Sequence, residues 1–147
     1  MNLNAVETLA PLYLEDETAW LEQMAALIAE GRFADLDYAN LGEFLTDMAR
    51  RDKREVMSRL TLLMIHRLEW EHQPEKRSRS LQATIAEQRR ELEDALESGT
   101  LRRYAQESLA KAHGGAIEQA AIETGLDGSA FPSESDRILE QWVSKID

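Results

Sequence analysis

Apolar residues recur along most of the chain at steps of three and four, the spacing that places them on one face of an α-helix. No segment shows the alternation of apolar and polar residues that is typical of a β-strand, and glycine and proline act mainly as punctuation. The pattern therefore predicts an all-α fold. We expect a compact bundle of about five to six helices without a sheet, forming a single helical domain over residues 1–147.

Cap residues and apolar stripes predict the first helices. One helix should begin at Glu15 or Asp16 and end before Gly31. Asp37 or Asn40 can cap a second helix, and the spacing of Asp52 and Glu55 is that of a capping box for a third, which should end before Pro74. The pattern leaves open whether the second and third helices are one kinked helix.

A fourth helix is predicted over residues 81–97, and a fifth should run from a cap at Thr100 to Gly125. The fifth contains Gly114 and Gly115, which indicate either close packing or a break. Residues 126–147 read as a loop followed by a short C-terminal helix. Residues 1–14 are expected to be an N-terminal segment that can be flexible.

The net charge of −11 is spread unevenly over the 147 residues. Residues 1–49 hold one arginine against ten acidic residues, residues 50–111 hold fourteen basic against eleven acidic residues, and residues 112–147 hold two against seven. Two interpretations remain open. Acidic helices can neutralise a mildly basic central hairpin, or the centre can carry an exposed basic patch.

A serine- and arginine-rich turn after Pro74 breaks a local rule. The N-terminus of a helix carries partial positive charge and favours acidic residues, yet this turn places arginines beside the likeliest cap serines. Short connections should also bring basic residues together at the opposite end of the helical hairpin. The candidate anion- or partner-binding residues are Lys76, Arg77, Ser78, Arg79, Ser80, Lys53 and Arg54. Their charges can be held by internal carboxylates or left for an external anion.

The sequence offers no basis for a catalytic residue, a metal site or a cofactor. There is no cysteine, no phosphate-binding glycine loop and no nucleophile motif. The three histidines, His66, His72 and His113, lie in different settings, and an enzyme would need dispersed residues. The lack of cysteine, of a signal peptide and of a long apolar run favours a cytoplasmic protein with no membrane contact.

Many short motifs occur along the chain in one order: Trp20, Gly31-Arg32-Phe33, Leu36-Asp37, Asn40-Leu41, Lys53-Arg54-Glu55, Trp70, Gln73-Pro74, Arg77-Ser78-Arg79-Ser80, Ile85, Gln88-Arg89-Arg90-Glu91-Leu92, Leu101-Arg102, Glu123-Thr124-Gly125-Leu126 and Phe131-Pro132. Over nearly the whole chain this series resembles the bacterial family catalogued as domain of unknown function twenty-nine. The resemblance implies a compact all-helical bacterial protein and no established activity.

Amphipathic helices and an acidic surface favour a non-catalytic protein-interaction or regulatory module, with another protein or a second copy as its partner. The alternative is a nucleic-acid or phosphate-binding protein that uses the basic Ser-Arg turn. That alternative is less favoured, because Arg89 and Arg90 share their helix with four acidic residues that can pair with them.

Overall fold

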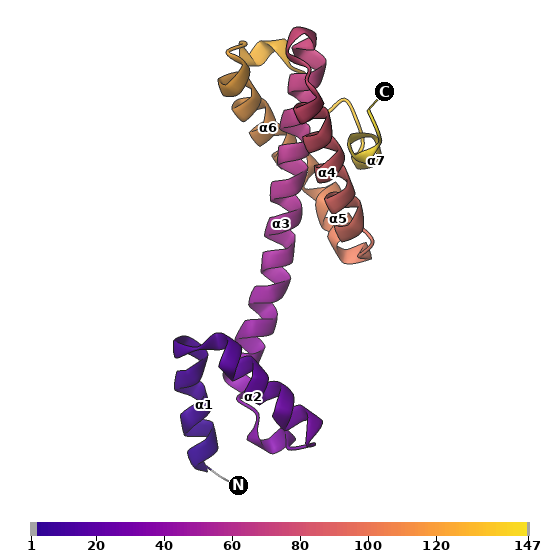
Figure 1. Cartoon of the computed structure of the whole chain (residues 1–147). Coiled ribbons are helices and arrows are strands. Elements are labelled where there is room, and N and C mark those ends of the chain that lie inside the picture. Colours follow the sequence, from indigo (N-terminus) through magenta and orange to yellow (C-terminus); the bar gives the residue numbers. More distant parts are fainter. Residues whose placement is uncertain (1–2, 147) are drawn as a thin grey trace. The chain divides into compact units, whose positions relative to one another are not determined.

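The computed structural model describes residues 3–146, with side chains from Leu9 onward. Over this range it has seven α-helices, three short 3₁₀ helices and no strand (Figure 1). The predicted all-α class is therefore confirmed. The contacts divide the chain into two compact units, Met1–Arg50 and Arg51–Asp147, which we describe separately.

The first unit contains α1 (Leu3–Glu15), α2 (Glu17–Ala29), the 3₁₀ helix η1 (Phe33–Asp35) and the start of α3 (Tyr38–His72). Helix α1 lies where the sequence analysis assigned no helix. Helix α2 confirms the first predicted helix: Asp16 caps it by accepting a hydrogen bond from the Ala19 backbone at 3.1 Å, and Gly31 follows it with φ of +71°.

Trp20 is fully buried at the centre of the first unit. Its ring packs edge-on against Tyr13, and its Nε1 donates to Asp37 Oδ2 at 3.1 Å. The same carboxylate accepts a hydrogen bond from the Asn40 amide side chain at 2.7 Å, at the start of α3. Asp37 thus satisfies the buried indole N–H and also orders the first turn of the helix.

Helix α3 resolves the question of the second and third predicted helices, because it is one helix of 35 residues. The predicted start at Asp52 and Glu55 is wrong, since both residues lie inside α3. Capping-box spacing is also the spacing of two neighbours on an exposed helix face, and no proline interrupts residues 38–72.

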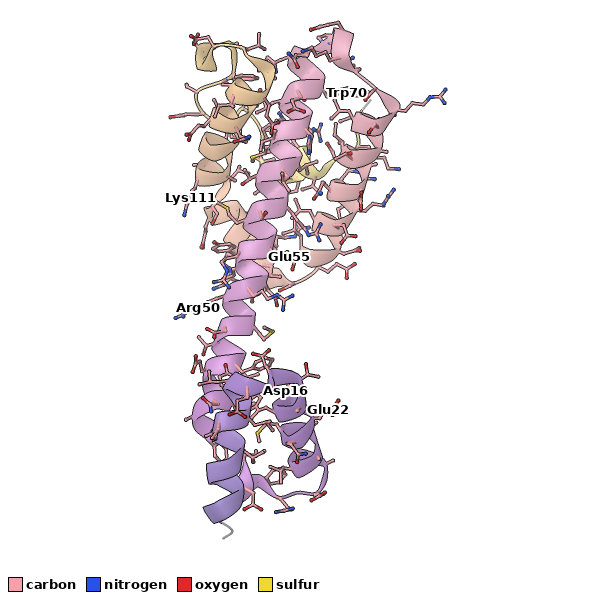
Figure 2. The ribbon with its side chains drawn as sticks, turned by 60° about the vertical axis from the view of Figure 1, so that its left-hand side comes forward. Asp16, Glu22, Arg50, Glu55, Trp70 and Lys111 are labelled. Carbon is pink, nitrogen blue, oxygen red and sulfur yellow. The ribbon has the colours of Figure 1, made fainter. Side chains whose placement is uncertain are left out.

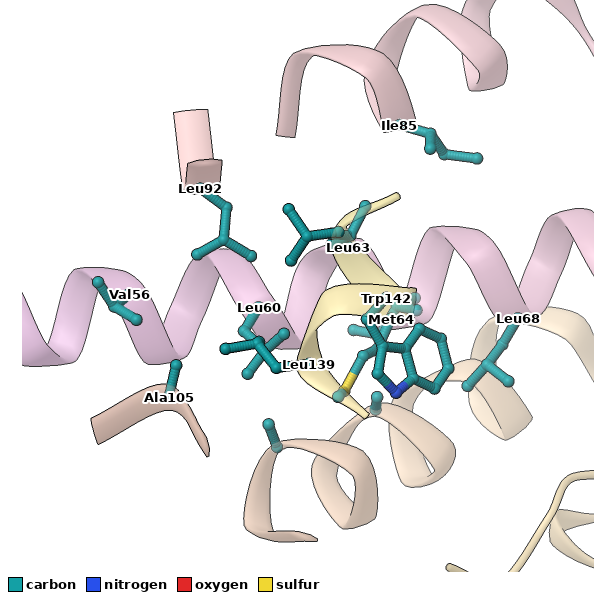
Figure 3. Packing of buried hydrophobic residues seen from close by; sticks show 14 of the residues in the cluster. Val56, Leu60, Leu63, Met64, Leu68, Ile85, Leu92, Ala105, Leu139 and Trp142 are labelled. Carbon is teal, nitrogen blue, oxygen red and sulfur yellow. The ribbon is translucent and has the colours of Figure 1, made fainter. Parts of the chain in front are cut away.

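The second unit is built around the later part of α3. It adds η2 (Pro74–Lys76), α4 (Arg79–Ala95), α5 (Gly99–Glu107), α6 (Leu109–Thr124), η3 (Gly128–Ala130) and the five-residue helix α7 (Leu139–Val143). Figure 3 shows leucines of α3 packed against Ile85 and Leu92 of α4 and against Leu139 and Trp142 of α7. Every one of these side chains is at most 1% exposed, so this is the main core of the unit.

The predicted fifth helix is two helices, because the chain breaks at Ser108 rather than at the glycine pair. Gly114 and Gly115 lie within α6. A methyl group added at Gly115 would lie 3.9 Å from Thr61 Cγ2, an ordinary van der Waals contact, and one added at Gly114 would meet no atom within 4 Å. The helix does not break at the glycine pair, and neither glycine is needed to make room for a neighbouring element.

None of the helices over residues 3–146 combines the length and the apolar character needed to cross a membrane.

Alanine substitutions at Gly114, inside α6, and at Gly125, directly after it, should change the stability of the protein in opposite directions. Gly114 is exposed in the helix interior with no atom within 4 Å of an added methyl group, so Gly114→Ala should stabilise the protein by about 1 kcal/mol. Gly125 ends α6 with φ of +72°, so Gly125→Ala should destabilise it by about 1 kcal/mol. Urea unfolding of the two variants measures both changes, and shifts of the same sign would contradict the description of α6.

Candidate anion-binding site

The Ser-Arg turn lies between α3 and α4, where two helices change direction. Ser78 is the cap of α4: its Oγ accepts a hydrogen bond from the Leu81 backbone at 3.0 Å. Helix α4 consequently begins at Arg79, two residues earlier than predicted. Ser78 therefore caps the helix, as its position in the sequence suggests. Arg77 and Arg79, on either side of it, take no part in the cap.

Arg77 is held by the end of α3 and not by a carboxylate. Its Nε donates to the Trp70 carbonyl oxygen at 2.8 Å, and its guanidinium carbon lies 4.8 Å from the centre of the Trp70 ring. Within the described residues, no carboxylate lies within ion-pair distance of Lys76, Arg77 or Arg79. The tryptophan orients the Arg77 guanidinium and leaves its positive charge unpaired.

Arg77 lines a pocket of about 440 Å³ on the second unit. The pocket is formed by the end of α3, the turn after it and the chain segment around α7. Trp70 and Ile146 contribute apolar surface to it. Its charged lining residues are Arg67, Glu71, Arg77, Arg137 and Lys145.

Arg137 and Glu71 form the ion pair of this pocket. The two guanidinium Nη atoms each lie 2.7 Å from one Glu71 oxygen, a two-pronged geometry, and the guanidinium carbon lies 3.9 Å from the centre of the Trp142 ring. This pair neutralises the one carboxylate of the lining. The other cations of the pocket are therefore not balanced by Glu71.

Arg67 is only 7% exposed and ties α3 to the segment after α7. Its Nη1 lies 2.7 Å from the carbonyl oxygens of Trp142 and Ser144 and 3.2 Å from that of Gln141. Burial lowers the pKa of Arg67, and the nearby charge of Arg137 lowers it further, while Glu71 opposes the change. The pocket wall thus carries an excess of positive charge around a desolvated guanidinium.

The pocket takes only part of the predicted turn. Arg77 lines it, whereas Lys76, Ser78, Arg79 and Ser80 are exposed and do not.

The other two predicted residues lie elsewhere on the second unit. Arg54 lines a separate groove, and the Lys53 ammonium lies 5.7 Å from the centre of the Tyr104 ring. Arg54 and Trp70 are sixteen residues apart on one helix, which is about 24 Å along its axis. The structure therefore does not bring the seven candidate residues into one site.

Three basic lining residues were missed by the sequence reasoning. Arg67 follows Leu63 and Met64 at helical spacing, and a charged residue on this face of the predicted core helix was an available signal. Arg137 and Lys145 gave none, because they reach the pocket from about 60 to 80 residues further along the chain. Their place depends on how α7 docks.

A pair of carboxylates lies on another face of the second unit. Burial, followed by a hydrogen bond with Glu123 and its charge, raises the pKa of Glu69 from 4.5 to about 7. The hydrogen bond with Glu69, and a second one with Gln119, lower the pKa of Glu123. His66 Nδ1 lies 3.4 Å from Glu69 Oε2, but burial lowers the pKa of this histidine. The pair therefore shares a proton near neutral pH.

The three histidines lie apart, as their sequence settings suggested. His72 packs on Phe131, and His113 is buried against Trp142. Among the side chains that the structure describes, no group of three or more histidine, aspartate or glutamate residues is placed to hold a metal ion.

The fold and the pocket define an all-α protein with a basic, partly apolar pocket at one helix turn. The family model described as Domain of unknown function DUF29 matches residues 12–145, so the chain belongs to this family. No curated protein and no solved structure was found to match the chain.

The Glu69–Glu123 pair predicts a pH-dependent stability difference. Since the folded pKa of Glu69 is raised, the folded state binds a proton that the unfolded state releases between pH 4.5 and about 7, and stability falls as pH rises through this window. Glu69→Gln removes that loss. The variant should gain stability relative to the parent protein as pH rises, measured by urea unfolding.

Glu118→Gln is the matched control, because Glu118 is an exposed carboxylate on α6. A difference between Glu69→Gln and the parent protein that does not change with pH would show that Glu69 holds no proton in the folded state.

Proposed function

We propose that this protein is a non-catalytic protein-interaction module that binds a carboxylate-bearing segment of its partner in the Arg77 pocket. The observation that carries the proposal is the unpaired Arg77 guanidinium, oriented by the Trp70 carbonyl and ring at a pocket with excess positive charge. A planar guanidinium with free N–H groups matches the two oxygens of a carboxylate.

The surroundings of Arg77 favour a peptide carboxylate over a phosphate. Trp70 and Ile146 offer apolar surface for the aliphatic stem of an acidic side chain or of a C-terminal residue. The net charge of −11 acts in the same direction against a nucleic acid.

A binding role also agrees with the chemistry of the lining. The Ser144 hydroxyl donates to the Gln141 carbonyl at 2.6 Å, and Glu71 is held by Arg137. Neither group is placed as a nucleophile beside a base. A cysteine-free chain is suited to a reducing compartment, and we propose a cytoplasmic setting on that basis.

Arg77→Gln should weaken binding of a labelled hexaglutamate peptide by about tenfold, because it removes a charge-assisted hydrogen bond and the cation itself. Fluorescence anisotropy at low ionic strength measures this affinity. Arg79→Gln is the matched control: it removes the same charge two residues away, outside the pocket. Equal losses in the two variants, or no binding to the parent protein, would contradict the proposal.

The nucleic-acid alternative is tested in the same experiment. Tighter binding of a single-stranded oligonucleotide than of hexaglutamate, with a steep salt dependence and loss in the Arg77→Gln, Arg79→Gln double variant, would favour that alternative. Affinity purification from the native cell with parent and Arg77→Gln baits then identifies the partner, which should be recovered with the parent only.

A further inference from the structure

A second concave surface of the second unit lies far along α3 from the Arg77 pocket. It is a groove of about 430 Å³ formed by α3, α5 and α6. Lys111, labelled in Figure 2, lies on α6 and is one of the lining residues. The groove is lined by Arg54, Met57, Ser58 and Leu62 of α3, Tyr104 of α5 and Lys111 of α6, together with Thr61.

The charges of the groove are all positive. Arg54 and Lys111 line it, and no acidic side chain does. Neither cation lies within ion-pair distance of a carboxylate in the described part of the chain. In a protein with 28 acidic residues against 17 basic ones, two neighbouring cations on separate helices without a carboxylate form a local field that attracts an anion.

The groove also offers hydrogen-bond donors. The Thr61 hydroxyl donates to the Met57 carbonyl at 2.8 Å and is therefore used within α3. The hydroxyls of Ser58 and Tyr104 make no hydrogen bond with another residue over the described range. Both are available beside the cations, and hydroxyls of this kind bind carboxylate and phosphate oxygens.

The remaining lining is apolar. Leu62 is 39% exposed although it belongs to the helix that forms the core, and Met57 and the Tyr104 ring are half-buried beside it. An exposed leucine that lines the same groove as a methionine and an aromatic ring offers a surface that an apolar group can cover. The groove is therefore amphiphilic, with cations and hydroxyls next to an aliphatic and aromatic floor.

We propose that this groove binds a small organic anion with an apolar body, such as an aryl or alkyl phosphate or carboxylate. Arg54 and Lys111 hold the anionic group, the Ser58 and Tyr104 hydroxyls donate to its oxygens, and Met57 and Leu62 cover its apolar part. This site is separate from the Arg77 pocket and does not depend on the proposed partner binding there.

The test is an NMR titration of the full chain with phenyl phosphate, inorganic phosphate and phenol as probes. Phenyl phosphate should bind more tightly than either of the others, because it alone satisfies both halves of the groove. The backbone amide signals of Ser58, Thr61 and Tyr104 should shift. Arg54→Gln and Lys111→Gln, on two different helices, should each weaken the binding of phenyl phosphate by about fivefold or more.

Arg103→Gln is the matched control, because Arg103 is exposed beside Tyr104 but does not line the groove. It should leave the affinity unchanged, and so should Arg77→Gln. Three results would overturn the proposal: no binding, equal binding of inorganic and phenyl phosphate, or a loss in Arg103→Gln as large as in Arg54→Gln. Loss of the Arg77 function alone would leave this site intact, so the two proposals fail separately.

Discussion

The hydrogen bonds from Arg67 to the chain around α7 are the interaction on which the second unit and its pocket depend. A helix of five residues is too short to be stable alone, and its last carbonyl groups need donors. Arg67 Nη1 supplies them at Trp142 and Ser144, more than seventy residues away in the chain. The docked α7 then buries Trp142 in the core and sets Arg137 and Lys145 at the pocket. The buried Arg67 guanidinium thus holds α7 in place and also adds positive charge to the pocket. Its charge is not neutralised, because it donates to backbone carbonyls and pairs with no carboxylate.

The sequence was sufficient for what is local. Helical periodicity gave the fold class, Asp16 and Ser78 are caps, and Gly31 and Gly125 follow helix ends with positive φ. Helix α1 was not predicted, and the cap of α5 is Ser98 rather than Thr100. The other errors concern helix continuity. Asp52 and Glu55 have the spacing of a cap yet lie within α3, and the break after α5 comes at Ser108, a residue with no strong breaking tendency. Helix continuity is decided by packing against other elements, which local residue patterns do not contain.

The candidate site was predictable in the same partial way. Arg77 was found because a positive charge is unfavourable near the N-terminus of a helix. Residues that go against such local preferences often belong to functional sites. Its partner was not foreseen. The two alternatives were an internal carboxylate or an external anion. Within the described residues no carboxylate pairs with Arg77, and a backbone carbonyl and a tryptophan ring hold its guanidinium. That contact orders the guanidinium without neutralising it. The position of the Arg77 side chain is therefore fixed while its positive charge remains unpaired. The other pocket residues come from distant positions whose meeting follows only from the docking of α7.

The two basic surfaces of the second unit differ in the groups that would meet an anion. The Arg77 pocket has four cations and one carboxylate, Glu71, which is paired with Arg137. The groove at Arg54 has two cations and no carboxylate in its lining. In both, apolar side chains lie beside the cations: Trp70 and Ile146 in the pocket, and Met57 and Leu62 in the groove. Because both surfaces share α3, their spacing is set by one continuous helix.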